Sequence, residues 1–412
     1  MKIQINRLTL PADRRILVTS DIHGQLGHLK GALETANFSK DDILFIIGDM
    51  IEKGPNSLGV LRYVMELCET HTVYPLIGNV DAHRLEMIGR WHIAEIYPYL
   101  KHMQRHWGGC LLSEMCEELG IRIRSPLDLL AARTKIQAGF QKELDFLKFL
   151  PTIIETPHFI FVHGGLPTQE LSTLEGTDAH PCLKNDAFLE KGLRFSKYVV
   201  VGHWPVTLYN DKIDCANPII NREQHIISID GGCSLKRTGQ LNLLIIPAED
   251  SEEFTFASFD GFPVRVALDP QEGSEDPFCL LYTDNAVRLL KREAEFSFVE
   301  HRHTGRRLWV LNEDLYGSGK AMHCDDSTDY RIPVRPGDRL SVILETSKGA
   351  LVKKDGVSGW YCGRLEEASE PACCKNFQNI SPRAQIGFAM ICARFFTQPL
   401  HRSFRQQQNL IE

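Results

Sequence analysis

Five apolar stretches of this sequence each end in a short motif that joins glycine to a polar side chain able to bind a metal. The motifs are Ser-Asp-Ile-His-Gly, Ile-Gly-Asp-Met, Ile-Gly-Asn-Val, Val-His-Gly-Gly and Val-Gly-His-Trp-Pro. Short apolar runs of this kind predict buried strands. Side chains at the ends of neighbouring strands meet at one rim of a sheet, so the fold must bring the motifs together there. Their metal-type residues are Asp21, His23, Asp49, Asn79, His163 and His203.

A strand-then-helix rhythm fills the first quarter of the chain. Predicted strands at 15–20, 43–47 and 72–77 alternate with helices at 26–36 and 57–68. Continuously apolar strands that alternate with helices indicate an α/β sheet covered on both faces. Such sheets hold their sites at the carboxyl ends of strands, where the five motifs lie. Further strands are predicted at 158–162, 198–201, 226–229 and 241–246.

Other segments divide the rest of the chain. We predict a catalytic domain at 1–250, with a helical insertion at about 91–150. The acidic stretch 249–253 marks the end of this domain. A β-rich connector follows at 251–304, where residues 254–268 alternate like a β-hairpin with its turn at Asp260-Gly261. Residues 305–370 resemble a small SH3-like β domain, and the tail 371–412 is expected to be helical or disordered.

The overall composition is that of an ordinary globular protein. The hydrophobic fraction is 43%, the charged fraction is 24% and the net charge is −7. This charge argues against a general nucleic-acid binder or a binder of anionic membranes. We expect no signal peptide and no spanning helix, mostly reduced thiols among the 12 cysteines, and a cytoplasmic location.

The polar residues of the motifs are suited to two metal ions. Asp21 and His23 point to the same side of an extended chain, because side chains alternate with period two. Asp49 supplies a carboxylate that can bridge two ions, and Lys53 follows it as a point charge for a phosphate oxygen. Oxygen and imidazole ligands at one rim favour two divalent metals, which suit phosphate ester hydrolysis. Mn²⁺ is the expected metal, with Fe or Zn as alternatives.

The series D-x-H, G-D-x-x-x-x-G, G-N, H-G-G and G-H resembles the calcineurin-like metallophosphoesterase superfamily, over roughly residues 15–247. The His-Gly-Gly and Gly-His-x-Pro forms look like the branch of phosphoprotein phosphatases and symmetrical diadenosine tetraphosphatases. The Ile-Asp-Gly-Gly-Cys segment is more similar to the tetraphosphatase side and to related bacterial enzymes. The resemblance implies a four-layer α-β-β-α sandwich.

The resemblance also implies a role for each metal position. Asp21 and His23 would hold the first metal, and Asp49 would bridge both. A hydroxide shared by the two metals would attack phosphorus in line with the leaving group. The remaining ligands, all on the second metal, would be Asn79, His163 and His203.

Two positions depart from the family pattern. Lys53 stands where the family has a phosphate-clamping arginine, and Val80 stands where it has a histidine that protonates the leaving group. Glu52 occupies the place of that histidine's acidic partner, which leads us to expect that Glu52 has lost its mate. Asp81 completes a Gly-Asn-Val-Asp series that resembles the Gly-Asn-Cys-Asp of some bacterial phosphodiesterases. His83 is a candidate replacement acid, although an exposed helix histidine is the alternative.

Two functions remain open at this point. The first is metal-dependent hydrolysis of a phosphate ester, whose substrate is a phosphoprotein, a dinucleoside polyphosphate or a small phosphodiester. The second is a metal-binding pseudoenzyme or scaffold that recruits a protein partner through the insertion and the SH3-like domain. The complete set of metal ligands favours the enzyme.

Overall fold

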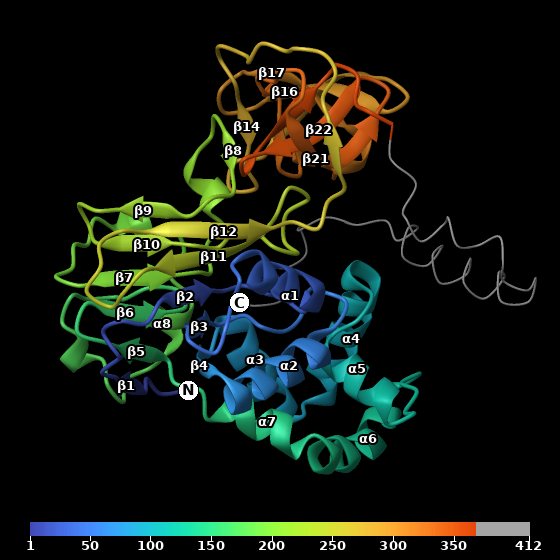
Figure 1. Cartoon of the computed structure of the whole chain (residues 1–412). Helices are drawn as coiled ribbons and strands as arrows, with labels where there is room; N and C mark the ends of the chain where they lie inside the picture. The colour runs from blue at the N-terminus through green and yellow to red at the C-terminus, as the bar shows by residue number, and fades with distance from the viewer. Residues whose placement is uncertain (368–412) are drawn as a thin grey trace, which may run out of the picture.

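The computed structural model describes residues 1–367 of the chain. The predicted tail at 371–412 and the end of the predicted SH3-like segment lie outside the described residues. Within them the chain forms a mixed α/β structure, as the sequence predicted (Figure 1). The four-layer arrangement, the SH3-like domain and the domain boundaries stay predictions.

The first sheet has five strands, in the order β12-β11-β2-β3-β4. Its centre is parallel: β2 pairs with β3, and β3 pairs with β4. β2 and β3 are completely buried, which their continuous apolar sequences explain. The strands are β2 (Ile16–Thr19), β3 (Ile43–Ile47), β4 (Thr72–Leu76), β11 (Leu241–Ile246) and β12 (Thr255–Phe259).

The second sheet has six strands, in the order β1-β5-β6-β7-β10-β9. β1 lies at its edge. β6, β7 and β10 run parallel, so their carboxyl ends share one rim. The strands are β1 (Ile5–Arg7), β5 (Ile153–Glu155), β6 (Phe159–Val162), β7 (Tyr198–Val201), β9 (Ile219–Asn221) and β10 (Ile226–Ser228).

The apolar faces of the two sheets pack against each other. The rings of Phe45 on β3 and Phe161 on β6 are stacked, with centroids 3.9 Å apart. Ile16, Val200 and Ile227 belong to the same buried cluster. Burial of these side chains, worth roughly 1.5–3 kcal/mol for each large one, fixes the sheets face to face and aligns their rims.

Helices pack beside the first sheet and beside one another (Figure 1). α1 contacts β11 and β12, and α2 contacts β4. The side chain of Asn56 caps α2 by accepting a hydrogen bond of 2.8 Å from the N–H of Gly59. The first three helices are α1 (Leu26–Thr35), α2 (Ser57–Thr70) and α3 (Asn79–Arg90).

The segment 91–150 is helical. Its first helix, α4, begins directly after α3, and its last two helices, α6 and α7, are separated at Phe140. α5 packs on α2, and α7 packs on α3. The insertion therefore covers the two helices that follow the Asp49 and Asn79 motifs. Its helices are α4 (Ile93–Trp107), α5 (Leu111–Glu118), α6 (Pro126–Gly139) and α7 (Gln141–Lys148).

The predicted hairpin at 254–268 is wrong. β12 pairs with β11 of the first sheet, whereas β13 (Val264–Val266) pairs with β21 (Arg339–Thr346). Alternation identified the strands but not their partners, because each segment pairs with a longer apolar strand elsewhere.

The loops between the strands contain one short α-helix and four 3-10 helices. They are α8 (His180–Leu183), η1 (Leu171–Thr173), η2 (Phe188–Lys191), η3 (Val206–Tyr209) and η4 (Asn312–Asp314).

Residues 264–361 are β-rich and lie at the far end of the molecule from α5–α7 (Figure 1). A five-stranded sheet, in the order β13-β21-β22-β23-β8, includes β8 (Asp214–Cys215) from the first part of the chain. The other strands of this part are β14 (Cys279–Leu280), β15 (Val287–Arg292), β16 (Phe296–His301), β17 (Arg307–Leu311), β18 (Leu315–Tyr316), β19 (His323–Cys324), β20 (Ser327–Thr328), β22 (Gly349–Lys354) and β23 (Val357–Tyr361). A 3-10 helix, η5 (Gly319–Ala321), lies between β18 and β19.

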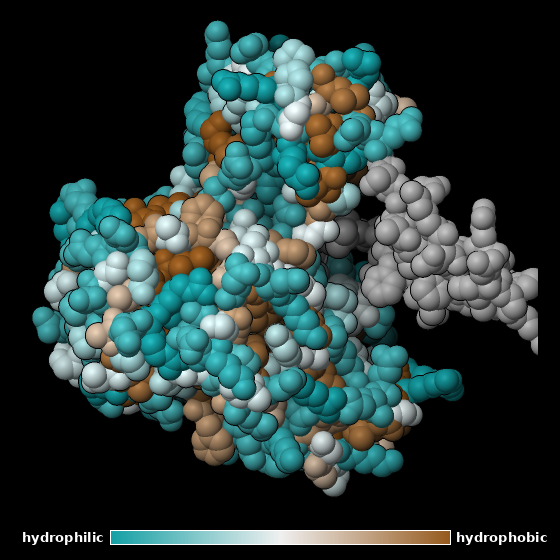
Figure 2. Space-filling model, in the orientation of Figure 1, coloured by the Kyte–Doolittle hydropathy of each residue, from teal (hydrophilic) through white to brown (hydrophobic). Residues whose placement is uncertain are grey.

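Hydrophilic side chains predominate on the face that Figure 2 shows, with small hydrophobic patches, one of them over the strands β9–β12. Among the described helices, none combines the length and the apolar character that crossing a bilayer requires.

Candidate metal centre

The five motifs meet where their strands end. Asp21 and His23 follow β2, Asp49 follows β3, and Asn79 opens α3 after β4. Main-chain bonds hold the first two motifs side by side: the N–H of His23 donates to the carbonyl of Asp49 at 3.0 Å. From the second sheet, His163 directly follows β6 and His203 follows β7.

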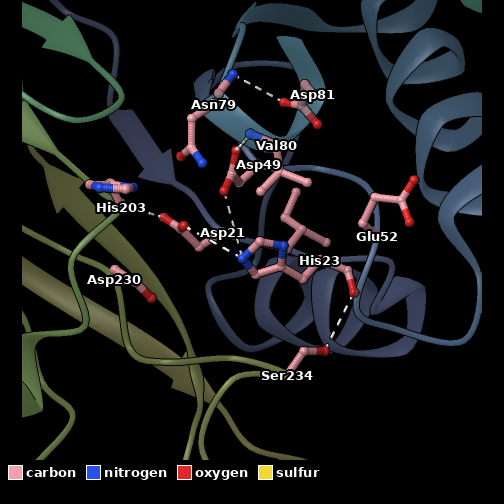
Figure 3. Close-up of polar contacts among 12 residues, drawn as sticks. Asp21, His23, Asp49, Glu52, Asn79, Val80, Asp81, His203, Asp230 and Ser234 are labelled. Atoms are coloured by element: carbon pink, nitrogen blue, oxygen red, sulfur yellow. Dashed lines mark hydrogen bonds and ion pairs between the residues drawn. The ribbon is translucent and has the colours of Figure 1, made fainter. Parts of the chain in front are cut away.

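One half of the centre is formed by Asp21, His23 and Asp49, which turn toward one another in Figure 3. Nε2 of His23 lies 3.8 Å from Oδ1 of Asp21 and 3.8 Å from Oδ2 of Asp49. Nδ1 of the ring faces the carbonyl of Ile51 at 3.3 Å and therefore donates, which leaves a lone pair on Nε2. Nε2 of His23 and Oδ1 of Asp21 are both buried without a hydrogen-bond partner.

The other half is formed by Asp49, Asn79 and His163. Nδ1 of His163 lies 2.9 Å from the carbonyl of Ile47 and must donate to it. Nε2 of the neutral ring then faces two acceptors, Oδ1 of Asn79 at 2.8 Å and Oδ1 of Asp49 at 3.5 Å. Acceptors gathered this closely require a cation, which is either a proton on His163 or a metal ion.

Asp186 orients His203, the last of the predicted ligands. Nε2 of His203 lies 2.8 Å from Oδ1 of Asp186. This hydrogen bond holds the pKa of Asp186 below its usual value, so Nε2 is the protonated nitrogen and Nδ1 keeps the lone pair. The N–H of His203 also donates to Oδ2 of Asp21 at 2.9 Å. No motif pointed to Asp186, because it lies in an irregular segment of the chain.

Burial is the largest influence on the pKa values of the residues in the centre. Burial raises the pKa of Asp21 and lowers the pKa of His23 to about 3, so the His23 ring is neutral. Burial also opposes ionisation of Asp49, but His163 and His23 outweigh it and hold the Asp49 pKa below its ordinary value. Burial and the nearby Asp21 raise the pKa of Asp230 well above its ordinary value.

The fit to two cations follows from these contacts. Ligand atoms of Asp21, Asp49 and His163 lie within 4.8 Å of one another. The two oxygens of Asp49 face different histidines, Oδ2 toward His23 and Oδ1 toward His163. A carboxylate so placed suits a bridge between two ions, and the buried lone pairs on either side are the ones such ions would satisfy.

The backbone around the ligands is strained. φ is positive at Asp21 (53°), His23 (47°), Asp49 (50°) and His203 (67°), a region that residues other than glycine rarely adopt. Neighbouring glycines make room: a Cβ on Gly78 would come within 2.1 Å of Oδ1 of Asp49. Strain of this kind persists where the surrounding structure holds it, and it concentrates at functional sites.

Lys53 is a cation without a partner among the described residues. Burial lowers its pKa, while Asp49, Asp21 and Asp230 act in the opposite direction. These three carboxylates therefore act on the ammonium group, and the phosphate clamp that the sequence predicted at Lys53 stays a prediction.

Glu52 lacks the family's histidine partner, because Val80 stands in its place, but its carboxylate has two other partners. Its Oε1 accepts a hydrogen bond of 2.8 Å from Nε of Arg84, and its Oε2 accepts one of 2.8 Å from the hydroxyl of Tyr99. Arg84 and Tyr99 come from α3 and α4, and no motif pointed to either residue. A buried carboxylate with both oxygens occupied is a structural anchor in this structure.

The other three predicted positions differ in their surroundings. Asp81 is fully buried and accepts hydrogen bonds from the N–H groups of Met50 and Gly78, both at 3.1 Å. Burial raises its pKa to about 7, assisted by Asp49. Val80 donates its backbone N–H to Oδ1 of Asp49 at 2.8 Å, and its side chain has no proton to give. His83 is exposed on α3, and burial of part of its ring lowers its pKa.

Asp230 is a further residue of the centre that the sequence analysis did not single out. Its Oδ1 accepts from the N–H of Gly232 at 2.8 Å, and its Oδ2 is buried without a partner. Two positions beyond Gly232, the hydroxyl of Ser234 donates to the carbonyl of His23 at 3.4 Å (Figure 3). The Ile-Asp-Gly-Gly-Cys segment was the signal that could have found it.

Part of the chain is similar in sequence to known proteins. The chain is similar to the symmetrical bis(5'-nucleosyl)-tetraphosphatase of Colwellia psychrerythraea, with 38% identity over 73 residues, 18% of this chain and 25% of that protein. For the protein of the same name from Hamiltonella defensa, identity is 42% over 66 residues, 16% of this chain and 23% of that protein. The chain therefore matches about a quarter of the length of these relatives.

Two solved structures are also similar. One is titled a putative diadenosine tetraphosphatase, with 18% identity and a TM-score of 0.38 over 62% of this chain and 99% of that one. The other is a serine/threonine phosphatase of Saccharomyces cerevisiae, with 12% identity and a TM-score of 0.39 over 64% of this chain and 85% of that one.

The family model of the calcineurin-like phosphoesterases matches residues 14–225, which is 212 of the 412 residues. This range contains the five motifs that carry the predicted metal ligands. The predicted superfamily is confirmed, and at the level of the family so is the predicted enzyme class, a phosphoesterase. The chain belongs to the calcineurin-like phosphoesterase family.

Proposed function

We propose that this protein hydrolyses phosphate esters with the help of two divalent metal ions. The observation that carries the proposal is the position of Asp49 between two sets of buried lone pairs. Oδ2 lies 3.8 Å from Nε2 of His23, and Oδ1 lies 3.5 Å from Nε2 of His163. Buried acceptors without donors are costly unless cations satisfy them.

Each metal would have its own set of ligands. Asp21, His23 and Asp49 would hold the first, and Asp49 would share the second with the amide oxygen of Asn79 and the free nitrogens of the other two histidines. When bound, such ions lower the pKa of a shared water and neutralise phosphoryl oxygens. Mn²⁺ is the expected metal, with Fe or Zn as alternatives, because mixed oxygen and imidazole ligands accept all three. The two histidines that would hold the second metal are His163 and His203.

Lys53 is proposed to bind a phosphoryl oxygen of the substrate. Its ammonium has no partner among the described residues and is close to Asp49 and Asp21. An ammonium placed here would orient the phosphoryl group as a point charge, without the two-pronged contact of an arginine. Substrate orientation would then depend more on the metals than on the side-chain clamp.

The substrate class follows from the missing proton donor. Val80 cannot protonate a leaving oxygen, Glu52 already accepts from Arg84 and Tyr99, and Asp81 accepts from backbone N–H groups. General acid help is worth roughly 10²–10⁴ in rate, so esters of poor leaving groups suffer most. We therefore favour dinucleoside polyphosphates, whose leaving group is a stable anion, over phosphoserine proteins. The names of the tetraphosphatase relatives support this choice.

A substrate panel tests the proposal. Protein loaded with Mn²⁺ is assayed on diadenosine tetraphosphate, an aryl phosphate, an aryl phosphodiester and a phosphoserine peptide. Hydrolysis of the first two, abolished in Asp49→Asn and retained in Asp41→Asn, is expected. Asp41 is an exposed aspartate outside the centre, which makes it a matched control. Absence of metal-dependent turnover on every substrate would favour the scaffold function instead.

A further inference from the structure

Tyr99 of α4, in the helical insertion, contacts the loop that follows Asp49. Its hydroxyl donates to Oε2 of Glu52 at 2.8 Å, while Nε of Arg84 donates to Oε1 at 2.8 Å. The side chains of Arg84 and Glu52 are 6% and 1% exposed. Glu52 lies between the bridging Asp49 and the unpaired Lys53, so this contact connects the insertion to the centre of the site.

The three side chains form a closed unit. The guanidinium carbon of Arg84 lies 3.6 Å from the centroid of the Tyr99 ring, so the cation is stacked on the ring that hydrogen-bonds its partner. The charge of Arg84 balances that of Glu52, and Tyr99 satisfies the second carboxylate oxygen. A buried ion pair completed in this way favours a single geometry more than it adds stability.

That geometry is needed because the loop is strained next to Lys53. Glu52 and Lys53 have φ values of 68° and 62°, a region that costs a residue other than glycine on the order of 1 kcal/mol or more. The loop is fixed on both sides of them. The N–H of Glu52 donates to Oγ of Ser57 at 3.0 Å, and Glu114 of α5 accepts from the N–H of Ser57 at 2.8 Å.

Lys53 follows Glu52 in this loop, and its ammonium has no hydrogen bond or ion pair among the described residues. The carboxylates of Asp49, Asp21 and Asp230 all act on its ammonium. We propose that Tyr99 is a positioning residue: through Glu52 it holds the strained backbone that directs Lys53 toward a phosphoryl oxygen. The inference rests on the proposed function, and it gives the insertion a role in substrate binding.

Binding of inorganic phosphate tests the inference without relying on turnover. Calorimetry on Mn²⁺-loaded protein measures the phosphate Kd of the wild type, Tyr99→Phe and the control Tyr97→Phe. Tyr97 lies on the same helix and donates to the carbonyl of Arg124 at 2.8 Å, away from the loop. Tyr99→Phe is expected to weaken phosphate binding about fivefold, and Tyr97→Phe less than twofold. The Mn²⁺ affinity of all three proteins should agree within about twofold.

A double-mutant cycle shows whether Tyr99 acts through Lys53. In a Lys53→Met background, Tyr99→Phe should change the phosphate Kd by less than about twofold, because the side chain it positions is absent. An equal loss in both backgrounds, or no loss in either, overturns the role of Tyr99 while the proposed function stands. Absence of phosphate binding by the wild type counts against both. If Tyr99→Phe does not fold, Glu52→Gln takes its place in the same cycle.

Discussion

Oδ1 of Asp186 lies 2.8 Å from Nε2 of His203, a nitrogen that cannot then bind a metal. The contact is a donation from the ring to the carboxylate, because an ionised carboxylate only accepts. It fixes the tautomer of His203 and leaves Nδ1 with the lone pair. Partners of this kind orient ligand histidines in many metal sites.

Replacing Asp186 should weaken the second metal selectively. In Asp186→Asn the amide no longer fixes the His203 tautomer, and we expect Mn²⁺ affinity at one of two sites to fall about 10–100-fold. Calorimetric titration of chelator-stripped protein measures both affinities. Glu190→Gln, an exposed carboxylate outside the centre, is the control. Unchanged affinity at both sites in Asp186→Asn would remove this residue from the metal centre.

The leaving group should control the rate of hydrolysis. Because Val80 has no proton to donate, kcat/KM for substituted aryl phosphates should fall steeply as the pKa of the departing phenol rises. The prediction is a clear negative slope in a plot of log kcat/KM against the pKa of the phenol. His83→Ala should leave the slope unchanged if this exposed histidine is not the acid. A flat dependence would reveal a general acid elsewhere in the site.

Asp81 should matter more for stability than for chemistry. Its carboxylate accepts from the N–H groups of Met50 and Gly78 inside a fully buried environment. Asp81→Ala leaves those donors unpaired and should lower the free energy of unfolding by about 2–4 kcal/mol, measured by urea denaturation. Asp81→Asn, which keeps one acceptor oxygen, should cost less. Wild-type stability with lost activity would instead support a catalytic role.

An acidic cluster in the β-rich part should make stability depend on pH. Burial raises the pKa of Asp325 to about 7, assisted by Asp314 and Asp326. The folded protein binds the Asp325 proton more tightly than the unfolded chain does. The stability gained from this protonation is therefore complete below about pH 4 and is lost as the pH rises through 7.

Asp325→Asn isolates this effect by difference. The variant should match the wild type at pH 4 and exceed it by about 1–2 kcal/mol in free energy of unfolding at pH 8. Urea denaturation at both pH values, with chelator present, provides the comparison. A difference that does not change with pH would show that Asp325 ionises normally in the folded protein.

The meeting of the motif residues at one rim could be predicted because their signal is local. Asp21, Asp49 and His163 each follow an apolar run within two residues, and parallel strands bring such ends together whatever the loops do. The same logic placed most strands of both sheets. Local pattern also gave the helical insertion, although the boundary between α6 and α7 at Phe140 left no clear trace in the spacing.

The partners of those ligands could not be predicted, since they depend on packing. Asp186 meets His203 only after β6 and β7 have paired, and Tyr99 meets Glu52 across 47 residues of chain. The hairpin expected at 254–268 failed for the same reason, because alternation does not specify which strand will be the neighbour.

Metal stoichiometry tests the central claim most directly. Chelator-stripped protein is titrated with Mn²⁺ by calorimetry, beside Asp49→Asn and the exposed control Asp41→Asn. Two equivalents should bind to the wild type and the control, and Asp49→Asn should lose tight binding of both ions, because the carboxylate lies between the two sets of ligands. One equivalent or none in the wild type, or full binding in Asp49→Asn, would contradict a bridged two-metal centre.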